Sequence, residues 1–141
     1  MVIEIKKLTA TAIIPKYVHA NDAGMDFYAD EDCLIKIGER KLISTGIAMA
    51  IPSGYAGLIW DKSGIASKFG LKTMAGVIDA SYRGEIKIVV HNLSNQDYQV
   101  EKGTKIAQML IQKVVQKELV EVAQLDSTSR GQDGFGSTGL K

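Results

Sequence analysis

Ile47-Ala48-Met49-Ala50-Ile51-Pro52-Ser53-Gly54 is a short run of strand-like residues that ends at a turn signal. The same unit recurs along the chain, where the dominant hydrophobic period is two rather than about 3.6. The other strand-like runs are residues 2–6, 34–37, 85–90, 98–101 and 118–122. Short strands separated by turns in this way indicate an all-β fold, either a sandwich or a barrel.

One short helix is expected among the strands, at Ser63-Gly64-Ile65-Ala66-Ser67-Lys68-Phe69-Gly70. Ile65 and Phe69 share one helix face, and Gly70 is a residue type that ends helices. The sequence shows no internal repeat, no heptad pattern and no domain boundary before about Asp126. We therefore expect a single β domain over residues 1–126, followed by a flexible C-terminal arm over residues 127–141.

Composition excludes several classes of partner and site. With 17 basic and 16 acidic residues the net charge is +1, so we expect no nucleic acid and no membrane as a partner. Cys33 is the only cysteine, and His19 and His91 stand far apart, which disfavours a disulfide framework and a zinc site. The composition is still compatible with a metal ion bound through oxygen ligands, such as Mg²⁺. The sequence has no signal-peptide core and no bilayer-spanning stretch, so a soluble, cytoplasmic protein is expected.

The segment Arg130-Gly131-Gln132-Asp133-Gly134-Phe135-Gly136-Ser137-Thr138-Gly139 carries the sharpest chemical signal. Ordering it costs on the order of 10 to 20 kcal/mol, whereas burying the ring of Phe135 returns roughly 2 to 3 kcal/mol, so we expect it to order only on a ligand. Glycine amides, the Arg130 guanidinium and the hydroxyl groups of Ser137 and Thr138 suit a polyphosphate. The alternative is an ordinary Gly/Ser-rich terminus. The match to G-x-G-x-x-G fails because no helix can follow it.

Two further segments place charge beside an apolar run or a helix start. Asp26 lies within the apolar residues 23–29, where an unpaired carboxylate is costly to bury. The alternative is an ordinary turn aspartate. Lys62-Ser63-Gly64 precedes the short helix, so free N–H groups, a hydroxyl and an ammonium group can converge there on phosphate. The alternative is a plain N-cap serine beside a solvated lysine.

Two other segments place polar groups beside apolar ones. Residues 75–85 read Ala-Gly-Val-Ile-Asp-Ala-Ser-Tyr-Arg-Gly-Glu, which predicts a tight hairpin with exposed backbone groups. Asp79 at its tip is suited to take a proton from water, and Tyr82 to pack against a sugar. The alternative is a turn aspartate and a half-buried tyrosine. Gln108 lies among apolar residues and needs a buried partner or a ligand, unless it is a satisfied strand glutamine.

The order of these five motifs is more specific than any one of them. They run Ala-Gly-x-Asp, Lys-Ser-Gly, Gly-Val-Ile-Asp-x-x-Tyr-Arg-Gly-Glu, Lys-Gly-x-x-Ile-Ala-Gln and Arg-Gly-x-x-Gly-Phe-Gly-Ser-Thr-Gly. In this order, over roughly residues 8–139, the chain resembles the homotrimeric dUTP pyrophosphatases (dUTPases). The resemblance implies a jelly-roll-like β fold and a homotrimer whose three shared sites each combine one subunit's hairpin with another's arm. It also implies Mg²⁺-dependent hydrolysis of dUTP to dUMP and pyrophosphate.

The resemblance implies roles for individual residues. Asp79 matches the base that activates water for attack on the α-phosphate, and Tyr82 the residue that packs under the deoxyribose and excludes a 2′-hydroxyl. Asp26 matches the carboxylate near the water shell of Mg²⁺. The other implied contacts are uracil for the backbone of Gly76, Val77 and Ile78, phosphates for Lys62, Ser63, Gly64 and Gln108, and closure over the nucleotide by Arg130, Phe135, Gly136, Ser137 and Thr138.

The implied role is to limit uracil incorporation into DNA and to supply dUMP for dTMP synthesis. The alternatives are a bifunctional enzyme like dCTP deaminase and a non-catalytic trimer that senses nucleotides. The deaminases resemble the chain less, because they lack the Gly-Phe-Gly-Ser-Thr-Gly arm and use a glutamate as the base. A pure binder gains nothing from Asp79, a carboxylate that would face phosphate.

Four residues depart from the family pattern. Lys62 stands where arginine is usual and gives a point charge in place of a planar fork. Asp61 precedes it and is expected to bring negative charge near the phosphates. Ser81 replaces an acidic residue, and Asp133 occupies a position that is often glycine. None of these changes removes an essential group, so they concern the strength of triphosphate binding.

Overall fold

The computed structural model describes residues 2–134, which form eleven strands and one helix. In chain order these are β1 (Glu4–Lys7), β2 (Met25–Tyr28), β3 (Cys33–Ile35), β4 (Arg40–Ile43), β5 (Ile47–Ala50), β6 (Tyr55–Trp60), α1 (Ser63–Phe69), β7 (Leu71–Met74), β8 (Val77–Ile78), β9 (Ile88–Asn92), β10 (Tyr98–Val100) and β11 (Lys105–Lys113). The prediction of an all-β fold with one short helix is confirmed.

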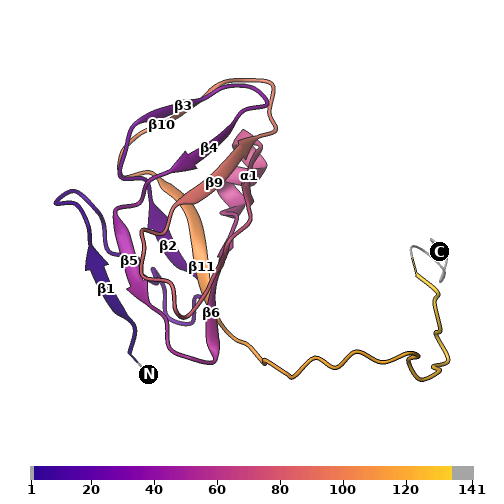
Figure 1. Ribbon diagram of the computed structural model, residues 1–141. Helices are drawn as coiled ribbons and strands as arrows, with labels where there is room; N and C mark the ends of the chain where they lie inside the picture. The colour runs from indigo at the N-terminus through magenta and orange to yellow at the C-terminus, as the bar shows by residue number, and fades with distance from the viewer. Residues whose placement is uncertain (1, 135–141) are drawn as a thin grey trace.

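The strands pair antiparallel in small sheets that surround one core (Figure 1). The largest sheet has the order β2-β11-β6-β8, and another has the order β4-β9-β7. β1 pairs with β5, and β3 pairs with β10. β11 therefore lies between β2 and β6, which brings three distant parts of the sequence together.

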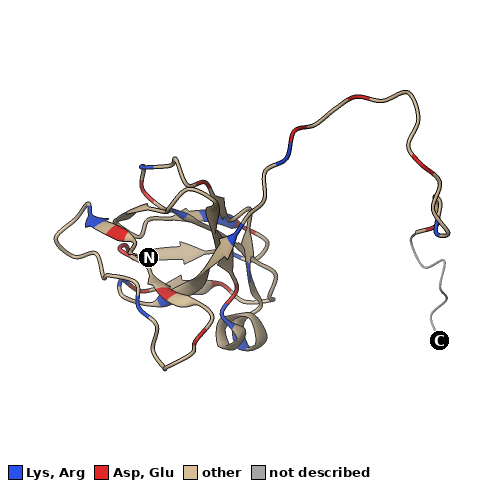
Figure 2. Ribbon diagram, turned by 90° about the horizontal axis from the view of Figure 1, so that it is seen from below, with Lys and Arg blue, Asp and Glu red and all other residues tan. Residues whose placement is uncertain are grey.

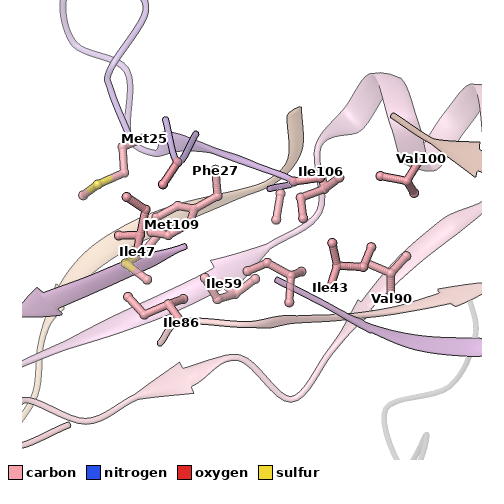
Figure 3. Close-up of a cluster of buried hydrophobic side chains, with 14 of the residues drawn as sticks. Met25, Phe27, Ile43, Ile47, Ile59, Ile86, Val90, Val100, Ile106 and Met109 are labelled. Atoms are coloured by element: carbon pink, nitrogen blue, oxygen red, sulfur yellow. The ribbon is translucent and has the colours of Figure 1, made fainter. Parts of the chain in front are cut away.

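The core is apolar, and Figure 3 shows its side chains meeting between the strands. Phe27 and Met109 are fully buried. β9 alternates between buried and half-buried residues, with Ile88 and Val90 inward, as a strand with one face in the core requires. All four residues of β2 are buried, and one of them is Asp26. The strand that helps to build the core thus also carries a carboxylate into the interior.

Most predicted strands are confirmed, although their ends shift. The predicted runs 2–6, 34–37, 47–51, 85–90 and 98–101 overlap β1, β3, β5, β9 and β10, respectively. The prediction for residues 118–122 is wrong, because this described segment is exposed and forms no strand. Strand-like alternation supplies no hydrogen-bonding partner, and a strand without one is not stable in water.

The predicted helix is confirmed as α1. Gly70 ends it with φ 63°, and its N–H donates to the Ala66 carbonyl at 3.0 Å. Lys62 occupies the N-cap position without a side-chain capping bond, so the alternative of Ser63 as N-cap is wrong. The N–H groups of the first turn therefore lack a side-chain acceptor. No residue of α1 is fully buried.

Residues 75–85 form a short strand and a turn rather than the predicted hairpin. β8 pairs with β6, an earlier strand, and the Tyr82 N–H then donates to the Asp79 carbonyl at 3.1 Å. Gly76 has φ 103°, and a Cβ there would lie 3.0 Å from the carbonyl oxygen of Ile59. Glycine is therefore required where the chain enters β8.

The described chain leaves the β domain after β11. The Val114 N–H donates to the Gly54 carbonyl at 2.9 Å, and residues 114–133 are exposed. Figure 1 shows this segment running away from the strands. The division near residue 126 stays a prediction. Among residues 2–134, no helix is long and apolar enough to cross a membrane.

Candidate active site

Asp26 on β2 is met by two lysine ammonium groups, while its own side chain is only 5 % exposed. Lys62, before α1, donates a hydrogen bond to Oδ1, and Nζ of Lys105, on β11, lies 2.9 Å from Oδ2. The N–H of Asp26 donates to the Lys16 carbonyl at 3.0 Å. The alternative of a turn aspartate is wrong, because this carboxylate lies on a buried strand and two cations offset its desolvation.

The charges in this cluster depend on one another. Burial raises the pKa of Asp26, but the hydrogen bond from Lys62 and the nearby ammonium groups of Lys62 and Lys105 outweigh burial and hold the pKa below its ordinary value. The close contact with the Asp26 carboxylate raises the pKa of Lys105. Asp26 and Lys105 are therefore both charged at neutral pH.

The cluster lines a cleft of about 290 Å³. Its lining residues are Val18, His19, Asp22, Ala23, Gly24, Asp26, Lys62, Lys105 and Gln108. The structure thus brings together three predicted site residues, Asp26, Lys62 and Gln108, from β2, the start of α1 and β11. Figure 2 shows basic and acidic residues interspersed over the β domain, and the cleft itself is lined by two lysines and two aspartates.

Gln108 has a partly buried hydrogen-bond partner, as the alternative of a satisfied strand glutamine predicts. Its Nε2 donates to the carbonyl of Asp61 at 2.9 Å, which links β11 to the end of β6. A Cβ on Gly24 would lie 2.6 Å from Oε1 of Gln108. Glycine at position 24 therefore leaves room for the amide, and a larger residue would displace it from the cleft.

The structure corrects the expectation for Asp61. Its carboxylate pairs with Nζ of Lys72 at 2.9 Å and accepts hydrogen bonds from the N–H and hydroxyl of Thr73 at 2.7 and 2.6 Å. Burial raises the pKa of Asp61, but these bonds outweigh burial and lower it. The negative charge is thus compensated by β7 and does not line the cleft.

The paired carboxylates predict that acid destabilises the fold. Despite burial, hydrogen bonds and nearby lysines lower the pKa of Asp26 and Asp61 below 3.8 and that of Glu85 below 4.5. Each lowered pKa contributes stability that is present above the ordinary value and is lost as pH falls through the folded value. The urea concentration at the unfolding midpoint should therefore be lower at pH 3 than at pH 7, and this difference should be smaller in Asp61→Asn. Equal midpoints at the two pH values would contradict this prediction.

Ser63 and Gly64 lie exposed at the start of α1, next to Lys62, and do not line the cleft themselves. A Cβ on Gly64 would meet nothing within 4 Å. Packing within the described chain therefore does not explain why glycine stands at this position. The backbone at the helix start stays accessible to a ligand that extends from the cleft.

Asp79 and Tyr82 lie on the turn after β8, away from this cleft. Asp79 lines a second depression of about 590 Å³, together with Ser53, Gly54, Tyr55, Ala56, Val77, Ala80, Ser81, Val114 and Gln116. Tyr82 is 45 % exposed, as the alternative of a half-buried tyrosine predicts, and its hydroxyl donates to the Glu85 carbonyl at 2.9 Å. A Cβ on Gly84 would lie 2.5 Å from that hydroxyl oxygen, so glycine makes room for the ring.

The predicted base and the predicted phosphate contacts do not meet within one copy of the chain. The depression beside Asp79 and the cleft beside Lys62 share no lining residue. Gly76 and Val77 line a third depression, of about 200 Å³, which also includes the exposed Trp60. Ile78 is half-buried on β8. The predicted site is thus present in separate parts.

The predicted closing residues lie beyond the β domain. Arg130 is exposed, and its Nε donates to the Asp133 carbonyl at 2.9 Å, while the Asp133 N–H donates to the Arg130 carbonyl at 3.1 Å. Asp133 therefore closes a local turn with the arginine. The other four predicted residues, Phe135, Gly136, Ser137 and Thr138, lie outside the described residues.

Sequence reasoning assigned no role to Lys105 and did not find Lys72. Lys105 belongs to the same motif as Gln108, but their spacing places them on opposite faces of a regular strand. A register shift in β11 brings both side chains to the same face, and the hydrophobic periodicity of the sequence does not reveal this shift. Lys72 is found only through the pairing of Asp61 with β7.

A family model described as dUTPase matches residues 10–139. The chain belongs to the dUTPase family. The deoxyuridine 5′-triphosphate nucleotidohydrolase of Nautilia profundicola is 48 % identical over 141 residues and is covered to 99 %, as is this chain. That of Clostridium acetobutylicum is 44 % identical, with 99 % of this chain and 97 % of the relative covered. The predicted family and enzyme class are thereby confirmed.

Solved dUTPases share the fold. A mutant dUTPase of Staphylococcus bacteriophage 80alpha with dUpNHpp gives a TM-score of 0.94 at 30 % identity, with 99 % of both chains covered. A mutant dUTPase of Staphylococcus aureus phage phi11, described for its coordination of a structural Mg(II) ion, gives 0.85 at 28 % identity, with 90 % of this chain and all of that one covered. The predicted jelly-roll-like β fold is confirmed for this dUTPase.

Proposed function

We propose that this dUTPase hydrolyses dUTP to dUMP and pyrophosphate by attack of water on the α-phosphate, with Asp79 as the base. The observation that carries the proposal is the cleft in which Lys62, Lys105 and Gln108 surround the buried Asp26. This cleft gathers cationic and N–H donors in one place, as binding of a triphosphate requires.

The reaction needs no covalent bond between the enzyme and its substrate. Phosphoryl transfer depends on positioning and on donors aimed at developing charge, so Lys62, Ser63, Gly64 and Gln108 would hold the phosphates in line. Asp79 would take a proton from the attacking water, and pyrophosphate would leave. Its place on a turn that lines an open depression supports this role, because both water and nucleotide can reach it.

The nucleoside would be recognised by the backbone around β8. The N–H and carbonyl groups of Gly76, Val77 and Ile78 would bind uracil, and the Tyr82 ring would pack under the deoxyribose. The 67 % exposure of Val77 supports this assignment, because a ligand can reach the chain at the start of β8. The hydroxyl bond of Tyr82 to the Glu85 carbonyl supports it too, because it fixes the ring.

Mg²⁺ fits this chain as an ion carried by the triphosphate. In residues 2–134 no three His, Cys, Asp or Glu side chains converge into a metal cage. Mg²⁺ commonly keeps water ligands and binds through one or two carboxylates plus substrate phosphates. Asp26 is the carboxylate that would hold its water shell. When bound, the ion would neutralise charge on the phosphates.

Completion of the site would require a homotrimer. The separation of Asp79 from the Lys62 cleft within one copy supports this arrangement, as does the course of residues 114–133 away from their own β domain. One subunit would supply Asp79, another the cleft, and an arm over residues 127–141 would extend from a β domain over residues 1–126. The arm residues that would close over the nucleotide are Arg130, Phe135, Gly136, Ser137 and Thr138, with Phe135 stacked on the base.

The reaction would keep uracil out of DNA by removing dUTP, and it would supply dUMP for dTMP synthesis. Its substrate is a free nucleotide, so the enzyme would work in the cytoplasm without a nucleic-acid or membrane partner. The net charge of +1 supports this view, because it provides no global field for polyanions.

The pocket predicts strong substrate selectivity. The kcat/KM for dUTP should exceed those for UTP and dTTP by at least about a hundredfold, because a 2′-hydroxyl meets Tyr82 and a 5-methyl group meets the backbone of β8. The measurement is pyrophosphate release from each triphosphate. Comparable kcat/KM values for dUTP and either competitor would rule this pocket out.

A pair of tyrosine variants separates the two contacts. Tyr82→Ala should raise the relative kcat/KM for UTP and leave the rejection of dTTP intact. Tyr17→Ala is the matched control, since Tyr17 is 50 % exposed and Tyr82 45 % exposed. The control variant should discriminate as the wild-type enzyme does.

A further inference from the structure

A β-bulge places Lys105 in the cleft. Side chains three positions apart on a regular strand point to opposite faces, so Lys105 and Gln108 should not meet. The register of β11 against β2 shifts between Lys105 and Ala107, and the consecutive residues Ile106 and Ala107 are 4 % and 0 % exposed. Bulges re-aim side chains and are common beside active sites. As a result, Lys105 and Gln108 both line the cleft.

Lys105 is held there mainly by charge. Its Nζ lies 2.9 Å from Oδ2 of Asp26, yet this oxygen accepts no hydrogen bond of good geometry. Oδ1 accepts one from Lys62. We therefore describe the Lys105 contact as an ion pair that a better acceptor can redirect. The side chain of Lys105 is 43 % exposed, so such an acceptor can approach from the cleft.

Asp30 is a second buried carboxylate with which the pairing of Asp26 can be compared. Asp30 is 4 % exposed, and the ion pair described for it is with Lys102, whose Nζ lies 3.4 Å away and whose side chain is 43 % exposed. Asp26 is equally buried but pairs with both Lys62 and Lys105. Asp30 also accepts a hydrogen bond from the Thr9 hydroxyl, so one lysine and one hydroxyl group meet this carboxylate. The cleft is lined by both lysines that pair with Asp26 and by Asp22, whose carboxylate accepts hydrogen bonds from the N–H groups of Val18 and His19.

We propose that Lys105 binds the triphosphate directly, as a second phosphate-binding cation beside Lys62. Asp26 holds both ammonium groups at the cleft before the nucleotide arrives, and phosphate oxygens then take over part of these interactions. Two point charges thus stand in for the planar fork that an arginine at position 62 would provide. The inference rests on the proposed function, because it takes the cleft to be the triphosphate site.

The test uses the full chain and two nucleotides, the non-hydrolysable dUpNHpp and dUMP, with binding measured by calorimetry. Lys105→Met keeps the length of the side chain without its charge and should weaken dUpNHpp binding roughly ten- to a hundredfold. The loss for dUMP should be much smaller, since dUMP has one phosphate group. Lys105→Arg should restore most of the affinity for dUpNHpp.

Lys102→Met is the matched control. It removes a lysine of equal exposure from an equally buried aspartate outside the cleft. It should leave both affinities unchanged and lower the Tm at least as much as Lys105→Met does, because Asp26 retains Lys62. Unchanged dUpNHpp binding in Lys105→Met, an equal loss for dUMP, or an equal loss in Lys102→Met would overturn the proposal. A wild-type chain that does not bind dUpNHpp would overturn the proposed function as well.

A measurement on the wild-type chain covers the case in which Lys105→Met does not fold. Lysines are acetylated with an amine-reactive reagent, with and without saturating dUpNHpp, and each site is followed by mass spectrometry. Bound dUpNHpp should slow acetylation of Lys105 several-fold and leave Lys102 unaffected. Equal rates at Lys105 in the two conditions would contradict direct contact with the phosphates.

Discussion

Asp79→Asn should still bind dUpNHpp but lose roughly a hundred- to ten-thousandfold in kcat, the range that a general base contributes. The amide keeps the size of the side chain and cannot accept the proton of the attacking water. Asp79 lies on an exposed turn that lines an open depression, so the substitution should leave the Tm near that of the wild type. Pyrophosphate release gives kcat, and calorimetry with dUpNHpp gives affinity.

Asp126→Asn serves as the control, since it makes the same chemical change at an exposed position outside both the cleft and the depression. This variant should turn over dUTP at the wild-type rate. Near-normal turnover in Asp79→Asn would show that the base lies elsewhere. Loss of dUpNHpp binding in Asp79→Asn would show instead that the residue acts in binding.

Deletion of residues 130–141 should leave a folded protein and cost at least about a hundredfold in kcat/KM. The described part of this segment is almost entirely exposed, so little apolar contact with the β domain is lost. Removal of even one preorganised donor typically costs about 2.7 to 4 kcal/mol of transition-state stabilisation, and the deletion removes Arg130 and the hydroxyl groups of Ser137 and Thr138. Thermal unfolding and pyrophosphate release are the two measurements.

Refolding Asp79→Asn chains together with chains truncated at residue 130 should recover part of the activity that each lacks alone. In a mixed trimer of the proposed kind, some sites would combine an intact Asp79 from a truncated chain with an intact arm from an Asp79→Asn chain. Differential tags verify that the two chains assemble together, and each variant refolded alone gives the background. Mixed trimers without recovered activity would mean that the arm does not complete the site of another subunit.

Period-two alternation predicted β9 because one face of this strand lies more deeply in the core than the other. It did not predict β2, whose residues are buried on both faces, or β11, whose bulge breaks the alternation. The run at residues 118–122 failed for the opposite reason. Its alternation is sound, but no partner strand is provided within the described chain.

For the site, the order of the motifs identified the candidate residues, but the sequence did not reveal which side chains pair with one another. Asp26 and Lys62 are named by separate motifs, and only the packing of β2 beside the start of α1 shows that they bind each other. The charge of Asp61 was misjudged because its partner, Lys72, lies on the strand that follows the helix. Such pairings depend on which strands are neighbours, and local patterns do not contain that information.

The position of bond cleavage tests the central claim most directly. Hydrolysis of dUTP in ¹⁸O-labelled water, followed by mass spectrometry of both products, reports which phosphorus the water attacks. Attack on the α-phosphate predicts equal amounts of dUMP and pyrophosphate, with one labelled oxygen in dUMP and none in pyrophosphate. Label in pyrophosphate, release of inorganic phosphate as the first product, or no hydrolysis of dUTP would contradict the account.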